Sequence, residues 1–216
     1  MLPTHELFEK LPDVEQDVRQ VEELPSPIER ALVALVIPVL DTPTACAVAK
    51  RTAKAMRRPM NRAKLDAFLG DLPRRLTRSP VLATVRRFLG WWADSEPPAE
   101  ELLASRISPE ELAARSGLKA PVCARVVLFT GSGPLLPLDP PIARVCIRHG
   151  WLDWPMSEPQ PWIPLEGLDR KVCLHLYFGM RSISRSHCKA RSPLCDTCTL
   201  RPLLPETGPC EPEVAM

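Results

Sequence analysis

Long apolar segments and glycine are both scarce in this chain of 216 residues. The longest apolar run extends from Ala31 to Leu40 and is interrupted by Pro38. It is far shorter than the ~20 residues that a membrane-spanning helix needs, so we expect no membrane partner. Glycine occurs nine times and proline 26 times, which predicts many short elements with abrupt ends. Glycine-rich phosphate loops, metalloprotease motifs and Ser/His/Asp arrangements do not occur in the sequence.

The N-terminal segment, residues 1–19, has neither the basic patch nor the apolar stretch of a secretory signal and carries Glu and Asp instead. We therefore expect a cytoplasmic protein. In that compartment its eight cysteines are thiols or metal ligands before they are disulfides. The length suits one domain or two small lobes, and 45% hydrophobic with 25% charged residues is typical of a soluble globular protein.

The net charge of +2 conceals an uneven distribution. Eight acidic residues lie between Glu6 and Arg30, whereas twelve basic and only two acidic residues lie between Lys50 and Arg87. A second basic stretch surrounds Arg181–Arg191. Segments with so many basic residues indicate either a phosphate-binding surface or an ordinary solvated helix face.

Helical signals occur along most of the chain. Ser-Pro pairs at Ser26, Ser79 and Ser108 each combine an N-cap with a proline at a helix start, and helically spaced apolar residues follow. No alternating strand pattern of useful length is present. The sequence therefore predicts an all-α fold.

One pair of helices is separated by a very short break. A helix over Pro109–Arg115 is followed by a break at Ser116–Lys119 and by a second helix that begins near Pro121. This is the pattern of a helix-hairpin-helix, whose outward-facing amides bind a DNA phosphate. An ordinary antiparallel helix pair has the same pattern, and Pro121 lacks one amide that such a site would use.

Three cysteines near the C-terminus follow metal-ligand spacing. Cys188, Cys195 and Cys198 form a Cys-x6-Cys-x2-Cys motif. The Cys-x2-Cys step lets two thiolates face one ion or cluster, and Cys188 supplies a third ligand. The next cysteine, Cys210, lies twelve residues after Cys198.

In combination, these residues resemble the endonuclease III family of helix-hairpin-helix DNA glycosylases. The shared features are the hairpin Gly117-Leu118-Lys119, an Asp before Pro140–Val145, and the three-cysteine motif, in the same order. Asp139 follows Pro121 by 18 residues and Cys188 follows Asp139 by 49, which match the family's separations between catalytic lysine, catalytic aspartate and first cluster cysteine. The resemblance covers residues 26–200.

The resemblance implies two helical lobes around a DNA-binding cleft. Residues 26–133 would form a six-helix barrel containing the helix-hairpin-helix (about 109–130). Residues 1–25 and 134–216 would form the second lobe, which holds a [4Fe-4S] cluster in the Cys-rich loop 188–210. Double-stranded DNA is then the expected partner of a monomeric protein, located at the nucleoid if the source is bacterial.

Asp139 is the predicted catalytic residue. Cleavage of an N-glycosidic bond builds positive charge on the sugar, which a fixed carboxylate stabilises while it orients the attacking water. The simpler interpretation is that an Asp before two prolines caps a helix.

Several positions depart from the family. Pro121 occupies the position of the family's Schiff-base lysine and has no nucleophile, so lyase chemistry there is excluded. Lys119 is either a substitute amine or, as we favour, a phosphate contact. Val39 or Leu40 takes the place of the glutamine that fills the hole left by the flipped base, and would act as an apolar wedge. Arg185 matches a family arginine and is expected to contact phosphate or the cluster side.

Several residues are candidates for the fourth cluster ligand, because Leu204 occupies the position of the family's fourth cysteine. Cys210 is the favoured replacement. Loss of the cluster, a zinc site, or a ligand such as His187 remain alternatives. The other histidines on helical patterns, His149 and His175, are predicted to be ordinary core or surface residues. The remaining cysteines are predicted to pack in the core: Cys46, Cys123, Cys146 and Cys173.

Two functions follow. The favoured one is a monofunctional DNA glycosylase of base excision repair that flips out a damaged or mismatched base and removes it by water attack assisted by Asp139. The alternative is a relative without catalysis that binds DNA or lesions for a partner.

Overall fold

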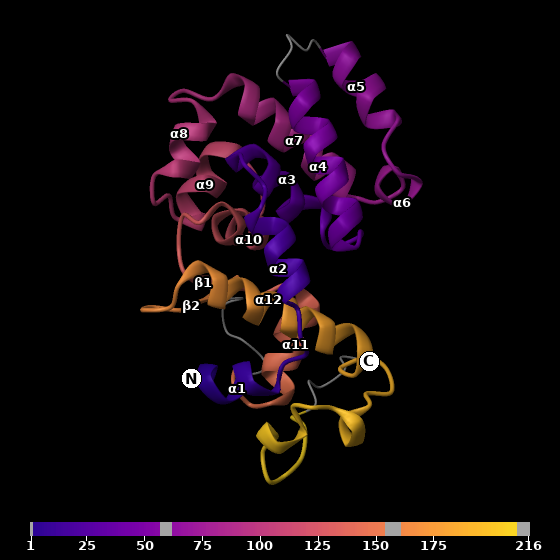
Figure 1. The fold of residues 1–216 in the computed structure, drawn as a ribbon, viewed down its shortest axis with the longest axis vertical. Helices are drawn as coiled ribbons and strands as arrows, with labels where there is room; N and C mark the ends of the chain where they lie inside the picture. The colour runs from indigo at the N-terminus through magenta and orange to yellow at the C-terminus, as the bar shows by residue number, and fades with distance from the viewer. Residues whose placement is uncertain (1, 57–61, 154–160, 211–216) are drawn as a thin grey trace. The chain divides into compact units, whose positions relative to one another are not determined.

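The computed structural model describes residues 2–56, 62–153 and 161–210, and these residues are mostly helical (Figure 1). They form two compact units: residues 16–134, and residues 1–15 together with 135–216. We name these the continuous unit and the split unit. No helix within the described ranges is long and apolar enough to cross a membrane.

The continuous unit consists of helices joined by short turns. Its order is α2 (Glu15–Glu22), α3 (Pro27–Val36), α4 (Thr42–Met56), α5 (Arg62–Gly70), α6 (Arg74–Thr77), α7 (Val81–Asp94), α8 (Ala99–Ala104), α9 (Pro109–Ser116) and α10 (Ala120–Thr130).

Helix α3 is the centre of this unit and packs against α4, α7, α8 and α10 (Figure 1). It begins as predicted: the Ser26 side chain and Glu29 form a reciprocal capping box, and Pro27 occupies the first turn. Every residue from Ala31 to Ile37 is buried. The buried Arg125 of α10 donates a hydrogen bond from Nε to the Ala34 carbonyl oxygen at 2.9 Å, which joins the two helices.

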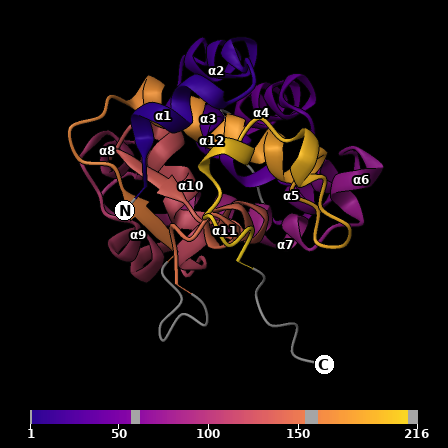
Figure 2. The same ribbon diagram turned by 90° about the horizontal axis from the view of Figure 1, so that it is seen from below.

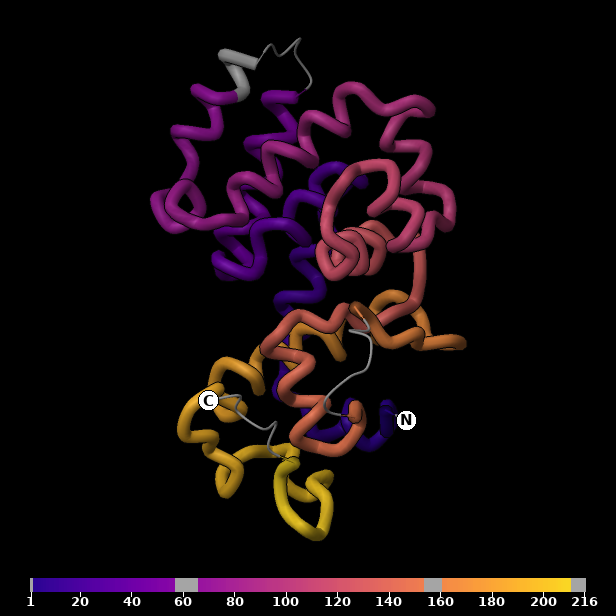
Figure 3. The backbone as a smooth tube through the Cα atoms, turned by 180° about the vertical axis from the view of Figure 1, so that it is seen from behind, coloured from indigo at the N-terminus to yellow at the C-terminus, as the bar shows by residue number. Residues whose placement is uncertain are grey.

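The split unit joins the two ends of the sequence. It contains α1 (Thr4–Lys10), β1 (Leu135–Pro137), α11 (Pro140–Arg148), β2 (Trp162–Pro164), α12 (Arg170–Ser186) and the short 3-10 helices η1 (Cys195–Thr197) and η2 (Arg201–Leu203). Helix α1 lies alongside α12 (Figure 2). The chain after α12 continues as a loop of short turns that contains η1 and η2 (Figure 3).

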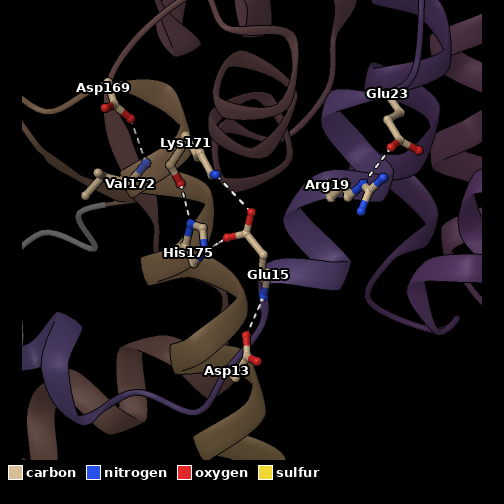
Figure 4. Close-up of polar contacts among 8 residues, drawn as sticks. All are labelled: Asp13, Glu15, Arg19, Glu23, Asp169, Lys171, Val172 and His175. Carbon is tan, nitrogen blue, oxygen red and sulfur yellow. Dashed lines mark hydrogen bonds and ion pairs between the residues drawn. The ribbon is translucent and has the colours of Figure 1, made fainter.

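Contacts between Glu15 and α12 anchor the N-terminal segment within this unit. The Glu15 carboxylate accepts hydrogen bonds from Lys171 Nζ at 2.9 Å and His175 Nε2 at 2.8 Å (Figure 4). These partners lower the pKa of Glu15. Leu11 lies so close to Gly179 that a Cβ added there would meet the Leu11 side chain at 2.7 Å. Only glycine therefore permits this approach.

The boundaries of the two units and the presence of a small sheet differ from the sequence predictions. The first boundary between units falls after residue 15 rather than 25. The reason is that α2 buries Val18 and Val21, and its Gln20 carbonyl oxygen accepts a hydrogen bond from Cys46 Sγ of α4 at 3.8 Å. The second boundary falls after 134, against a predicted 133. A small antiparallel sheet also pairs Leu136 with Ile163. Three residues per strand are too few to show an alternating pattern.

Candidate functional site

Three segments of the split unit meet around one small cavity that contains the three motif cysteines. The end of α11 contributes Arg148 and His149, and the end of α12 contributes His187 and Cys188. The following loop supplies the rest of the lining: Cys195, Cys198, Arg201 and Leu204. The structure therefore brings together the three cysteines that the sequence grouped by spacing.

Two arginines on one face of α11 hold the cysteine loop. Arg144 Nε donates a hydrogen bond to the Cys188 carbonyl oxygen at 2.9 Å. Arg148 Nη1 donates to the Lys189 carbonyl oxygen at 2.6 Å and to Cys188 Sγ at 3.5 Å. Because these arginines lie four residues apart, they project from the same side of the helix. The loop is thus fixed to α11 through the carbonyl oxygens of Cys188 and Lys189.

A buried cation lies beside one thiol of the cavity. Arg148 is only 3% exposed and places its guanidinium beside Cys188. Burial raises the pKa of Cys198, and the nearby thiols of Cys188 and Cys195 raise it further. A bound cation or cluster would offset this cost of ionising Cys198.

Cys210, the predicted fourth ligand, lies outside this lining. Its backbone N–H donates to the Arg148 carbonyl oxygen at 2.9 Å, and its side chain is exposed near Gly150. Leu204, which stands where the family has its fourth cysteine, does line the cavity. The loop therefore returns to the cavity at Leu204, whose side chain cannot bind a metal.

The residue types around the cavity fit an iron–sulfur cluster. Within the described parts of the chain, no three His, Cys, Asp or Glu side chains lie close enough together to hold a single metal ion. That finding concerns one ion, whereas each cysteine of a [4Fe-4S] cluster binds a different iron atom. Three thiols lining one cavity beside a buried guanidinium form a suitable donor set for such an anionic group.

The remaining cysteines, Cys46, Cys123, Cys146 and Cys173, are all buried in helices, as predicted. Burial raises the pKa of Cys146 to about 12 and of the other three to about 11. Their thiols therefore stay protonated at neutral pH and are poor nucleophiles and poor metal ligands.

Asp139 is held by a tyrosine and does not act as a capping side chain. It occupies the N-cap position of α11, yet its side chain makes no capping hydrogen bond. The two residues that follow, Pro140 and Pro141, have no N–H to offer it. Instead, Tyr177 of α12 donates its hydroxyl hydrogen to Asp139 Oδ2 at 3.1 Å, and both residues are buried. The carboxylate thus has a fixed orientation that helix capping does not explain.

The hairpin between α9 and α10 consists of Gly117, Leu118 and Lys119. Gly117 ends α9 with φ +65°, a conformation that favours glycine, and Arg87 Nη1 donates to its carbonyl oxygen at 2.8 Å. Leu118 is 6% exposed and its N–H donates to Ser116 Oγ, so its side chain packs inward. The N–H groups of Lys119 and Ala120 make no hydrogen bond to any described residue. Those two N–H groups are therefore available to donate hydrogen bonds to an anion.

Other predicted DNA contacts differ in accessibility. Val39 and Leu40 lie in the turn after α3; Leu40 is 4% exposed, whereas Val39 keeps more accessible surface. Only Val39 can serve as a wedge without rearrangement. Arg185 is exposed in the last turn of α12. Among the tryptophans, Trp151 stacks on His149 with ring centroids 4.5 Å apart, and Trp154 lies outside the described residues.

Sequence reasoning missed three residues of these sites: Arg148, His149 and Tyr177. They lie 38 to 40 positions from Asp139 or Cys188 along the chain. His149 is buried, with Nδ1 2.9 Å from the Val145 carbonyl oxygen. Burial lowers the pKa of His149, while the carbonyls of Val145 and Leu200 oppose that shift. The only sequence signal for these missed residues was the helical spacing of Arg144 and Arg148. Their contacts with Cys188 and Asp139 depend on how α11 packs against α12.

Comparison with known proteins does not assign the chain to a family. No protein-family model matches the sequence, and no curated protein matches it significantly.

Proposed function

We propose that this protein is a monofunctional DNA N-glycosylase with an iron–sulfur cluster held by Cys188, Cys195 and Cys198. The observation that carries the catalytic part is the Asp139 carboxylate, which is buried, makes no side-chain capping hydrogen bond to α11 and accepts a hydrogen bond from the Tyr177 hydroxyl. In a structural N-cap, the carboxylate oxygens accept hydrogen bonds from the first N–H groups of the helix. A carboxylate that is held by a separate hydrogen-bond donor instead suits electrostatic catalysis.

The proposed reaction breaks the bond between the sugar C1′ and the base. Asp139 stabilises the positive charge that develops on the sugar and accepts a hydrogen bond from the attacking water. The water oxygen adds to C1′ and the bonding electron pair leaves with the base. The water loses one proton and the departing base gains one, so the step balances without another reactant. Pro121 offers no amine, so the product is an abasic site without a covalent enzyme intermediate.

DNA binding is supported by charge and by the hairpin. The exposed cations of the continuous unit include Lys50, Arg51, Lys54, Arg74, Arg75 and Arg78. Lys119 adds a side-chain cation next to the two amides that make no hydrogen bond within the described residues. Such groups bind phosphates without regard to sequence, and affinity should therefore fall steeply with salt.

The cluster has a structural role in this proposal. Cys188, Cys195 and Cys198 would hold it, and it would supply a cross-link in the loop between α12 and η2 and a negative charge next to Arg148. The loop's own residues then hold their positions through Arg144 and Arg148 of α11.

The test is a base-release assay on duplexes containing oxidised, deaminated or mismatched bases, developed with hot alkali. We expect strand scission with at least one lesion, a loss of about 10²-fold or more in Asp139→Asn, and unchanged DNA binding in that variant. Borohydride should trap no covalent complex. Tight DNA binding without scission on any lesion would instead establish the non-catalytic, lesion-binding alternative.

A further inference from the structure

Cys195 and Cys198 lie at the two ends of one tight turn. The 3-10 helix η1 begins at Cys195, and the Cys198 N–H donates to the Cys195 carbonyl oxygen at 3.2 Å. A turn closed in this way holds its end Cα atoms within about 7 Å, and side chains three residues apart in a 3-10 helix project from the same side. The Cα atoms of disulfide-bonded cysteines are usually about 4.4–6.8 Å apart. The backbone of η1 therefore suits a bond between these two sulfurs.

Both side chains line the same cavity beside α11, and both are half-buried, so a small oxidant in solution has access to them. The four cysteines in helices are buried, and Cys210 is exposed but does not line the cavity. Among the described cysteines, only Cys195 and Cys198 combine partial exposure with a place in this cavity.

Cys188 is the competing partner, because it lines the same cavity and its thiol acts on that of Cys198. It is only 6% exposed, and its Sγ accepts a hydrogen bond from Arg148 Nη1 at 3.5 Å. Its carbonyl oxygen accepts a second hydrogen bond, from Arg144 Nε at 2.9 Å. Cys188 is thus shielded and held against α11, whereas Cys195 and Cys198 already share one turn.

We propose that Cys195 and Cys198 are a site of reversible oxidation, at which peroxides form a disulfide in the metal-free protein. Hydrogen peroxide converts one thiol to a sulfenic acid: an S–O bond forms, the O–O bond breaks and one water leaves. The second sulfur then attacks the first. The S–S bond forms, the S–O bond breaks, and the hydroxyl leaves as water with the proton of the second thiol. Two thiols and one peroxide give one disulfide and two waters.

The disulfide has a consequence for the cavity. A sulfur that is bonded to another sulfur has no thiolate to offer a metal. Oxidised protein should therefore take up no iron until a thiol reductant restores both cysteines. This consequence rests on the cluster of the proposed function, whereas the disulfide itself requires neither the cluster nor DNA binding.

The test uses the full-length protein, freed of metal with a chelator, treated with hydrogen peroxide, and then alkylated and digested. Mass spectrometry should find Cys195 joined to Cys198, with the loss of two hydrogen atoms, and dithiothreitol should reverse the change. Cys195→Ser and Cys198→Ser should each abolish this species. Cys188→Ser and the matched exposed control Cys210→Ser should retain it. Circular dichroism checks that each variant is folded.

The outcomes separate this inference from the proposed function. A disulfide between Cys188 and Cys198, or oxidation of either turn cysteine to a sulfinic acid without a disulfide, would overturn the assignment. Oxidised protein that takes up as much iron as reduced protein would show that the disulfide does not block the cavity. Reduced protein that binds no iron would overturn the cluster alone, because the mapped disulfide would still stand.

Discussion

The cysteines of this protein fall into two groups that differ in their surroundings. Cys46, Cys123, Cys146 and Cys173 are buried in helices and do not line the cavity, and burial raises the pKa of each to about 11 to 12, with the Cys188 thiol adding to the shift of Cys146. Cys188, Cys195 and Cys198 share one cavity, with a buried guanidinium beside Cys188. The same side chain is a small hydrophobic residue in the first setting and a candidate ligand in the second. The neighbours of the sulfur, rather than its burial alone, distinguish the groups.

The largest expected effect separates the groups by metal content. Cys198→Ala should lose most of its bound iron, because it removes a proposed ligand, whereas Cys173→Ala should retain the wild-type amount. Elemental analysis and the visible absorption of the purified proteins measure this. Equal iron in both variants would show that the cavity cysteines are not ligands.

Substitution of Arg148 tests whether this residue anchors the loop that carries the cavity cysteines. Arg148→Met should lower the free energy of unfolding by about 2–3 kcal/mol, because it removes the hydrogen bonds from a buried charged group to Cys188 and Lys189. The matched control is Arg201→Met, since Arg201 also lines the cavity but its pairing with Asp196 at 3.4 Å is solvent-exposed. That change should cost less than about 1 kcal/mol. Urea denaturation provides the comparison, and equal losses would contradict the anchoring role.

The core group should respond to polarity. Cys173→Ser places a hydroxyl in a fully buried position and should cost about 1–2 kcal/mol without affecting iron content. Cys210→Ser, at an exposed position, should change stability by less than about 0.5 kcal/mol. A neutral result for Cys173→Ser would mean that this site tolerates a polar atom.

The smallest effect is a dependence on alkaline pH. In the unfolded chain, the four core thiols ionise near pH 8.5, whereas in the fold their pKa values are about 11 to 12. Their stabilising contribution is complete below pH 8.5 and is lost as pH rises through the folded values, because the unfolded state releases protons first. Stability should therefore fall between about pH 8.5 and 11. Cys146→Ala should show a shallower decline than the wild type.

Local signals predicted the helices well. The Ser-Pro starts at Ser26 and Ser108 appear as N-caps, and Gly117 ends α9 in the left-handed conformation. The third start was wrong by one residue, because α7 begins at Val81 with Pro80 rather than Ser79 at its N-cap. These features involve residues within a few positions of one another, so a single sequence suffices to identify them. The all-α prediction is confirmed for most of the described chain, with the exception of the small β1–β2 sheet.

Signals that depend on distant residues were missed. Residues 16–25 were predicted to join the C-terminal part, yet α2 belongs to the continuous unit because Val18 and Val21 are buried there. The hairpin amides were predicted to face a DNA phosphate, yet the Leu118 N–H donates to Ser116 Oγ and the Leu118 side chain packs inward. Burial depends on which helices meet, and a single sequence does not reveal this.

The sequence by itself determined the helices, the spacing of Cys188, Cys195 and Cys198, and the absence of an amine at position 121, because these are properties of local chemistry. Only the tertiary structure decided which residues surround those groups. The packing of α11 against α12 brings Arg148 and His149 to the cysteines and Tyr177 to Asp139. Contacts between residues about forty positions apart follow from the geometry of two packed helices, and the spacing of residues along the sequence does not reveal that geometry.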